Sequence, residues 1–170
     1  MTPRAAGDRQ RWAVESMAVA AGDRVLEIGC GGGTATSLVA ARLDSGRVLA
    51  IDRSATAVRA ARERNAARIY AGTVEVRQAD ITSAELPEGE FDRVFAVNLS
   101  LFWLATPAGL VERVRRLLAP GGTLYVFAER PTRAAVAAIA GETARALRAG
   151  GFDPVTASVT RNRAAVVAAR

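Results

Sequence analysis

The stretch VLEIGCGGGTATSLVA, residues 25–40, decides how the chain is read. An apolar run rises to Ile28, breaks into a glycine loop that starts at Gly29, and continues as a helix-like segment. A strand, a glycine loop and a helix in this order are typical of nucleotide-binding α/β folds. The G-x-G-x-x-G spacing of dinucleotide folds fails here, because Thr34 occupies the place of the third glycine.

A carboxylate, Glu27, stands directly before the glycines. Two unit charges about 5 Å apart interact by about 3 kcal/mol at an effective dielectric constant near 20, so this acid opposes a pyrophosphate and favours a cation. We therefore expect a ligand that is positively charged near the loop and still carries a ribose. The alternatives are a paired strand-end carboxylate without a ligand and a glycine turn that serves only the backbone.

Short apolar strands alternate with helical patterns along the chain, which predicts a parallel sheet covered by helices. The strand-like runs are 24–28, 47–51, 73–79, 91–97 and 123–128. The helical patterns are 3–20, 34–44, 54–67, 107–118 and 132–149.

Local signals place the ends of several elements. Ser54 is expected to cap one helix, and Thr106 before Pro107 is expected to cap another. The turn residues 120–122 are expected to end that second helix and lead into a strand. The runs 154–160 and 164–169 then predict an antiparallel hairpin.

Two more acids follow strands. Asp52 ends the second strand-like run, about 20 residues beyond the loop, where a carboxylate can accept from ribose hydroxyls, and Asp80 follows the third. In an open α/β sheet these strand ends surround one crevice, so Glu27, Asp52 and Asp80 are expected to converge. Taken singly, Asp52 also suits a helix N-terminus and Asp80 a loop cap.

Composition narrows the classes of function. The net charge is +6 and, with no lysine or histidine, all positive side chains are arginines, which are scattered at spacings of solvated helix faces. This pattern argues against a nucleic-acid partner.

Cys30 is the single cysteine, so an intrachain disulfide and a cysteine metal cluster are excluded, and no metal constellation is visible. Because no run resembles a signal peptide or a membrane span, we expect a cytoplasmic protein without a membrane partner.

The sequence resembles a class I S-adenosylmethionine-dependent methyltransferase. VLEIGCGGG (25–33) is similar to the first motif of that family, and VLAIDRSATAVRAAR (48–62) to the second. VRQADI, FDRVFAVNLSLFW and RLLAPGGTLYVF follow in the family's order. The resemblance implies a Rossmann-like, doubly wound, seven-stranded and mostly parallel sheet with a C-terminal antiparallel strand.

The resemblance also implies roles for matching positions. S-adenosylmethionine is the expected cofactor, with S-adenosylhomocysteine as product and no metal. Glu27 and the loop glycines would face its methionine end, Asp52 its ribose, Asp80 the adenine amino group, and Asn98 the departing methyl. The expected cofactor-binding residues are Glu27, Gly29, Cys30, Gly31, Gly33, Asp52, Arg53, Asp80, Ile81 and Asn98. Cys30 is interpreted as packing and not as a nucleophile.

The acceptor is expected to be a small molecule or a short peptide, because the chain has no large insertion and NLSLFW lacks the N-P-P-Y/F pattern of amino-group methyltransferases. In-line transfer then depends mainly on proximity and orientation. The catalytic residue stays open, with Glu129 and Asn98 as weak candidates. The expected substrate-pocket residues are Trp12, Ser16, Phe102, Trp103, Arg130 and Arg133. Phe102 and Trp103 also suit helix packing, and the two arginines also suit a solvated surface.

One domain is expected over 1–170, with a helical lid at 1–21, a cofactor-binding core at 22–128 and a final helix and strand pair at 129–170. A monomer or a homodimer fits this organisation. Other hypotheses are a methyltransferase-fold protein that binds S-adenosylmethionine or S-adenosylhomocysteine without methyl transfer, a nucleic-acid or protein methyltransferase, and a nicotinamide-dependent oxidoreductase.

Overall fold

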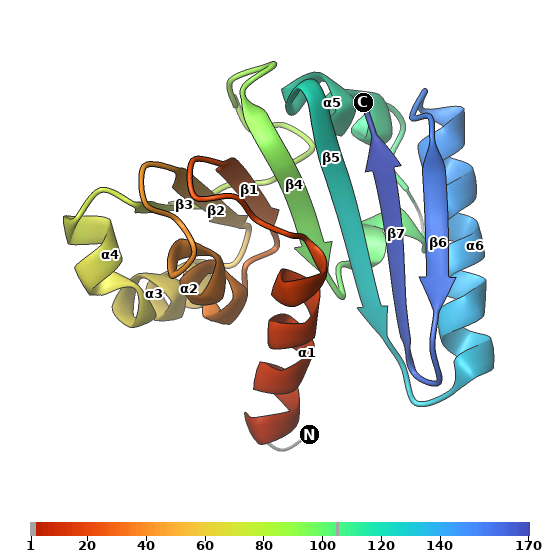
Figure 1. Cartoon of the computed structure of the whole chain (residues 1–170), viewed down its shortest axis with the longest axis horizontal. Helices are drawn as coiled ribbons and strands as arrows, with labels where there is room; N and C mark the ends of the chain where they lie inside the picture. The colour runs from red at the N-terminus through yellow and green to blue at the C-terminus, as the bar shows by residue number, and fades with distance from the viewer. Residues whose placement is uncertain (1–2, 105) are drawn as a thin grey trace. The chain divides into compact units, whose positions relative to one another are not determined.

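The computed structural model describes residues 3–104 and 106–170, and it divides the chain into two compact units, Met1–Ala84 and Glu85–Arg170. Figure 1 shows the helices and strands of each unit. Each unit is described by itself below. None of the helices in the described ranges is both long and apolar enough to cross a membrane.

The first unit contains three parallel strands in the order β3-β2-β1. Its elements are α1 (Pro3–Ser16), β1 (Arg24–Ile28), α2 (Thr34–Ala40), β2 (Arg47–Asp52), α3 (Ala55–Arg64), α4 (Ala66–Tyr70) and β3 (Val74–Gln78). The strands β1 and β2 are almost continuously buried, as expected for central strands of a parallel sheet. Their register pairs Ile28 with Ile51, so both strands end at the same edge.

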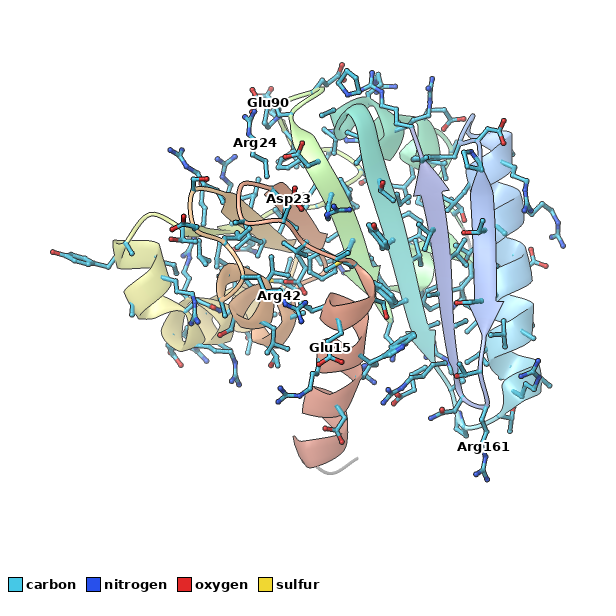
Figure 2. The ribbon with its side chains drawn as sticks, in the orientation of Figure 1. Glu15, Asp23, Arg24, Arg42, Glu90 and Arg161 are labelled. Carbon is cyan, nitrogen blue, oxygen red and sulfur yellow. The ribbon has the colours of Figure 1, made fainter. Side chains whose placement is uncertain are left out.

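Helix α1 packs on α2 through buried apolar side chains. Ala13, Val14 and Met17 are buried, and Arg42 donates a hydrogen bond from Nη1 to the carbonyl oxygen of Val14; Figure 2 shows Arg42 beside α1. The helix ends four residues before the expected boundary, because Ala18 adopts a left-handed backbone with φ 47°. A lid role for residues 1–21 stays a prediction, and residues 1–2 lie outside the described part.

The second unit contains four strands in the order β4-β5-β7-β6. Its elements are β4 (Phe91–Val97), the 3₁₀ helix η1 (Ser100–Phe102), α5 (Leu110–Leu117), β5 (Leu118–Glu129), α6 (Arg133–Ala149), β6 (Val155–Val159) and β7 (Arg163–Ala169). β4 and β5 are parallel, whereas β7 is antiparallel to both β5 and β6. Helix α6 runs along β6 and β7 (Figure 1).

Two expected boundaries in this unit are wrong. Thr106 does not cap a helix that begins at Pro107; α5 begins at Leu110, after Gly109 in a left-handed conformation with φ 75°. The turn residues 120–122 do not separate helix from strand, because β5 already begins at Leu118 and includes them. At the start of α5, left-handed Gly109 prevails over the helix-start signal of Thr106 and Pro107. In β5, the strand ladder prevails over the turn signal of residues 120–122.

Ser54 caps α3 as predicted, since its side chain accepts a hydrogen bond from the backbone N–H of Ala57 at 3.3 Å. The C-terminal hairpin of β6 and β7 is antiparallel, also as predicted. The strands are parallel within the first unit and between β4 and β5 in the second, and β7 is antiparallel to its neighbours; this mixed arrangement confirms the predicted Rossmann-like fold class.

Candidate functional site

The glycine loop between β1 and α2 is fixed by backbone hydrogen bonds to the end of β2. The N–H groups of Gly29 and Cys30 both donate to the carbonyl oxygen of Ile51, at 2.8 and 3.0 Å. Gly31, with φ 52°, donates its N–H to Oδ2 of Asp52 at 2.9 Å. A side chain added at Gly31 would meet no atom within 4 Å, so this part of the loop faces open space. That opening suits close approach by a ligand.

Gly33 has a different reason to be glycine. Its φ is 72°, and an added Cβ would lie 2.6 Å from Nδ2 of Asn65 and 2.9 Å from Cα of Ala61. The close approach at Gly33 is therefore to helix α3. A role for Gly33 toward a ligand stays a prediction.

Two residues that the sequence analysis missed, Arg64 and Asn65, hold this loop in place, and a third, Thr36, bonds to Glu27 in β1. Arg64 donates from Nε to the carbonyl oxygen of Gly32 at 2.8 Å, and buried Asn65 donates from Nδ2 to that of Gly33 at 3.1 Å. Thr36, on α2, contacts Glu27. Arg64 and Asn65 lie about thirty residues from the loop in sequence. No local pattern could have indicated that contact.

Glu27 is buried in β1, with 2% of its surface exposed. Thr36 Oγ1 donates to its Oε2 at 2.5 Å. Burial raises the pKa of Glu27 to about 8, with a smaller contribution in the same direction from the charge of Asp52, while the hydrogen bonds from Thr36 act in the opposite direction. Burial therefore favours the protonated form of this carboxyl in the ligand-free protein.

Asp52, at the end of β2, is half-buried and connects two backbone segments. Its Oδ2 accepts from Gly31 and its Oδ1 accepts from the N–H of Ser54, each at 2.9 Å. A carboxylate has about four acceptor positions, so two remain for other donors such as hydroxyl groups. Asp52 therefore connects the glycine loop to the start of α3, and its carboxylate can still accept further hydrogen bonds.

Asp80 is exposed two residues after β3. Its Oδ1 accepts from the N–H and the hydroxyl of Thr82, at 2.9 and 2.7 Å, and these bonds lower the pKa of Asp80, assisted by the charge of Arg53. Arg53 is exposed, whereas Ile81 is buried at 3%. The bonds from Thr82 give Asp80 the geometry of a loop cap, which the sequence analysis named as the alternative to a ligand role.

Cys30 is buried at 6% exposure. Burial, followed by the negative charges of Glu27 and Asp52, raises the pKa of its thiol to about 12. Since the thiolate is the nucleophilic form, this environment suits packing and not covalent chemistry.

In the second unit, Asn98 connects the ends of the parallel strands β4 and β5. Its backbone is left-handed, with φ 57°, and its N–H donates to the carbonyl oxygen of Phe127 at 2.8 Å. The side-chain Oδ1 accepts from the N–H of Glu129 at 2.7 Å and from Arg130 Nη1 at 3.3 Å. These two donors fix the orientation of the amide.

Glu129, a catalytic candidate from the sequence, is an ion-pair partner of Arg163. The Arg163 Nε lies 2.6 Å from Oε2 of Glu129, and the two side chains are 26% and 18% exposed. The two residues are directly opposite each other on β7 and β5. This pairing favours a structural role for the carboxylate.

The two arginines after β5 differ in their surroundings. The Arg130 guanidinium lies over the ring of Trp103, 5.5 Å from its centroid, and is half-buried. Arg133 is exposed and donates to the carbonyl oxygens of Val159 and Thr160, at 3.3 and 3.5 Å. The structure therefore joins Arg130 to Trp103 and attaches Arg133 to the β6–β7 hairpin.

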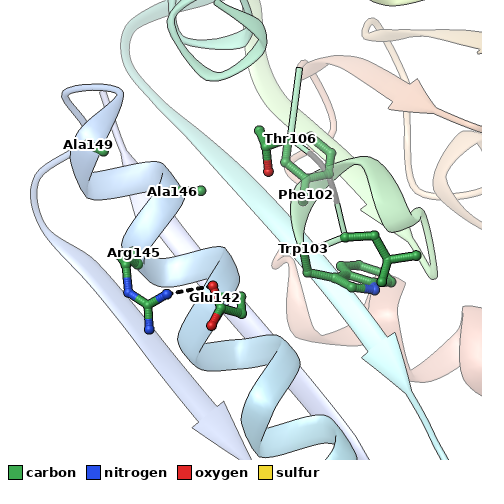
Figure 3. A pocket seen from close by; sticks show the side chains of 8 residues that line it. Phe102, Trp103, Thr106, Glu142, Arg145, Ala146 and Ala149 are labelled. Atoms are coloured by element: carbon green, nitrogen blue, oxygen red, sulfur yellow. Dashed lines mark hydrogen bonds and ion pairs between the residues drawn. The ribbon is translucent and has the colours of Figure 1, made fainter. Parts of the chain in front are cut away.

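Phe102 and Trp103 also line a pocket of about 290 Å³ between η1 and α6 (Figure 3). Across the pocket, Arg145 pairs with Glu142 at 2.5 Å. Phe102 is fully buried, which agrees with its packing alternative, whereas Trp103 is half-buried.

The remaining predicted pocket residues belong to α1. Trp12 is half-buried, and Ser16 is exposed and donates from Oγ to the carbonyl oxygen of Trp12 at 2.8 Å. Among the described residues, no group of three or more aspartate, glutamate, cysteine or histidine side chains has a geometry that could hold a metal ion.

Comparison with known proteins identifies the family. A family model described as a methyltransferase domain matches residues 25–122. A trans-aconitate 2-methyltransferase of Paracidovorax citrulli (strain AAC00-1) is 37% identical over 122 residues, which are 70% of this chain and 45% of that relative. One from Methylobacterium nodulans (strain LMG 21967 / CNCM I-2342 / ORS 2060) is 37% identical over 150 residues, 84% of this chain and 55% of the relative. The chain thus spans about half the length of these curated relatives.

Solved structures agree on the fold. A crystal structure of a SAM dependent methyltransferase from Aquifex aeolicus has a TM-score of 0.79 and 19% identity, and the match covers 99% of this chain and 93% of that one. At this identity the match shows the fold alone. Together with the glycine loop and the acids at the strand ends, the sequence matches lead to one conclusion: the chain belongs to the methyltransferase-domain family, with the class I S-adenosylmethionine-dependent fold.

Proposed function

We propose that the chain binds S-adenosylmethionine and transfers its methyl group to a small-molecule acceptor. One observation carries the proposal: buried Glu27 and half-buried Asp52 flank a glycine loop whose Gly31 faces open space. A buried carboxyl without a cationic partner costs stability. A ligand with an ammonium and a sulfonium at the loop and a ribose at Asp52 compensates that cost.

The residues of the first unit have separate tasks in this proposal. Glu27, held by Thr36, becomes ionised when the ligand's positive charge approaches, and Asp52 accepts from the ribose hydroxyls. Asp80, whose lowered pKa keeps it ionised, accepts from the adenine amino group beside Arg53 and Ile81. Cys30 packs behind the loop. Bound S-adenosylmethionine supplies an activated methyl group, and its demethylated product is S-adenosylhomocysteine.

The transfer step needs alignment more than acid–base help. With S-adenosylmethionine held at the loop, the protein would need chiefly to align the acceptor with the methyl group, and proximity alone can supply several kcal/mol. The sequence contains no histidine and no lysine, and Glu129 is paired with Arg163. These facts support a mechanism in which the acceptor attacks without a dedicated protein base.

The small-molecule acceptor is supported by the relatives, which are named trans-aconitate 2-methyltransferases. Trans-aconitate is a tricarboxylate, so it is the first acceptor to test. A monomer or homodimer in the cytoplasm, with neither nucleic acid nor membrane as partner, remains our expectation for the chain.

Two measurements test the proposal. Calorimetry with S-adenosylmethionine, S-adenosylhomocysteine and NAD should show binding of the first two and not of NAD. Incubation with methyl-deuterated S-adenosylmethionine and trans-aconitate, and separately with a cell extract, should give a product heavier by one labelled methyl group. Tight NAD binding would overturn the cofactor assignment, and cofactor binding without any labelled product would indicate a protein that holds the cofactor without transferring its methyl.

A further inference from the structure

We propose that the Nε–Nη2 edge of Arg130 binds a carboxylate of an anionic methyl acceptor. Trp103 and Asn98 act as positioning residues for this guanidinium. The inference rests on the proposed function and specifies the chemical class of the acceptor and the residue that anchors it.

One edge of the guanidinium is already fixed by the protein. Arg130 Nη1 donates to the carbonyl oxygen of Glu129 at 2.7 Å and to Asn98 Oδ1 at 3.3 Å. The ring of Trp103 covers one face of the guanidinium, 5.5 Å from ring centroid to Cζ. Stacking and two hydrogen bonds to one nitrogen reduce the freedom that a flexible arginine would lose on binding.

The opposite edge has donors to offer. Within the described part of the chain, no hydrogen bond uses Nε or Nη2 of Arg130, and no carboxylate forms an ion pair with it. The adjacent acid, Glu129, pairs with Arg163 instead, at 2.6 Å. Two parallel N–H donors on a planar, permanently charged group match the two oxygens of a carboxylate.

Asn98 has a left-handed backbone, with φ 57°, a conformation that glycine adopts freely and asparagine adopts more readily than most other residues. A glycine would lose the Oδ1 that orients both Arg130 and the N–H of Glu129. The asparagine side chain therefore adds this orienting contact to a turn that glycine could also make.

The position agrees with a ligand site. Asn98 directly follows β4 and Arg130 directly follows β5, so both lie at the carboxyl ends of two neighbouring parallel strands. In open α/β sheets, ligands bind beyond these ends. A carboxylate acceptor also agrees with a chain that lacks histidine and lysine, because it is ionised at neutral pH without a base.

A purely structural role for Arg130 makes a different prediction. As a clamp between the ends of β4 and β5, the side chain needs only Nη1. Replacing it would then change stability and leave ligand affinity as it is. Ligand affinity measured on folded variants therefore separates the two roles.

The test measures binding of trans-aconitate, succinate and benzoate by calorimetry in the presence of saturating S-adenosylhomocysteine, with the trimethyl ester of trans-aconitate as a ligand without carboxylates. The variants are Arg130→Met and Arg130→Lys. The matched control is Arg161→Met, which removes the same charge at an exposed position of the same unit, where the side chain points into solvent (Figure 2).

We expect Arg130→Met to weaken the carboxylates at least thirtyfold, with S-adenosylhomocysteine affinity unchanged and ester binding unchanged. Arg161→Met should stay within threefold of the wild type. Arg130→Lys keeps a charge and a donor to the β5 end, so it remains informative if the methionine variant does not fold; it should still weaken the carboxylates at least tenfold, because an ammonium lacks the planar fork.

Wild-type carboxylate affinity in either folded Arg130 variant would overturn the inference, as would the failure of every carboxylate to bind a wild-type protein that binds S-adenosylhomocysteine. The proposed function fails by a separate result, namely a wild-type protein that does not bind S-adenosylhomocysteine.

Discussion

Thr36 on α2 donates a hydrogen bond to Glu27 on β1, with 2.5 Å between Oγ1 and Oε2, and both side chains are buried. The hydroxyl satisfies one oxygen of a carboxyl group that has been removed from water. Because burial outweighs this bond, the pKa of Glu27 rises from its ordinary value of 4.5 to about 8. This pair makes both stability and ligand binding depend on pH.

The first prediction is that Glu27→Gln stabilises the ligand-free protein at alkaline pH. Below pH 4.5 the glutamate is protonated in the folded and the unfolded state, so it imposes no pH-dependent cost. Between pH 4.5 and 8 the unfolded state releases the proton and the folded state keeps it, so stability falls as pH rises; above pH 8 the cost is constant. At about 1.4 kcal/mol per pKa unit, the cost amounts to several kcal/mol.

Urea unfolding at pH 5, 7 and 9 measures this difference. The free energies of unfolding of wild type and Glu27→Gln should diverge with rising pH in favour of the variant. Glu63→Gln is the control, because that side chain is exposed on α3 in the same unit. Parallel pH profiles for wild type and Glu27→Gln would show that Glu27 is already ionised in the folded protein.

A second prediction concerns the ligand. If an ammonium lies at Glu27, binding of S-adenosylhomocysteine ionises this carboxyl and releases a proton below pH 8. The affinity of the protein for S-adenosylhomocysteine should rise between pH 6.0 and 7.5, by up to about tenfold per pH unit. Calorimetry in buffers of different ionisation enthalpy counts the released protons. Adenosine lacks the ammonium, so its binding should release no proton. Glu27→Gln should abolish the proton release on binding of S-adenosylhomocysteine. If S-adenosylhomocysteine binds the wild type without proton release, Glu27 does not contact the ligand's ammonium.

A third prediction separates two adjacent glycines. Gly33→Ala should lower the free energy of unfolding by about 2–4 kcal/mol, because the new Cβ would approach the backbone of Ala61 to 2.9 Å at a left-handed position. Gly32→Ala should change stability by less than about 0.5 kcal/mol, since no atom lies within 4 Å of its Cβ. Urea unfolding measures both. Equal losses in the two variants would contradict the packing reason for Gly33.

The same Gly32→Ala variant tests the open face of the loop. A methyl group there would meet no protein atom within 4 Å and would extend into open space beside the loop. If the ligand approaches the loop at this position, the affinity of Gly32→Ala for S-adenosylhomocysteine should fall at least tenfold while the protein stays folded. Unchanged affinity would show that the ligand does not approach the loop at Gly32.

These residues also show what the sequence can predict. Strands β1 and β4 were predicted to the residue, because an apolar run between turn signals is a local property. The acids at strand ends follow from the same local pattern. Contacts such as that of Arg64 with Gly32 join a helix to a loop that is distant in sequence, so no local sequence pattern predicts them.

Where local signals compete, the sequence predicted the boundaries of elements less well. A threonine before a proline is a good helix start, yet α5 begins at Leu110 because Gly109 adopts the left-handed conformation that redirects the chain. Likewise, the sequence predicted both Arg130 and Arg133 as substrate-pocket residues and could not separate them. Only the ring of Trp103 and the carbonyls of the hairpin separate them in the structure.

The last prediction concerns Glu129, the best-placed acid after β5. Its carboxylate is paired with Arg163 in a partly buried ion pair, so Glu129→Gln should lower the free energy of unfolding by about 1–2 kcal/mol. Glu88→Gln removes a more exposed partner, that of Arg116, and should cost less than about 1 kcal/mol. The chemical rate of methyl transfer in Glu129→Gln should fall less than about tenfold, because the acceptor attacks without a protein base.

Single-turnover rates for acceptors of different acidity provide the measurement. The limb of the pH–rate profile should move with the pKa of the acceptor and stay the same in Glu129→Gln. A limb that remains fixed for all acceptors, together with a loss of about a hundredfold or more in Glu129→Gln, would make Glu129 the general base. In that case the ion pair with Arg163 would have to open during the reaction.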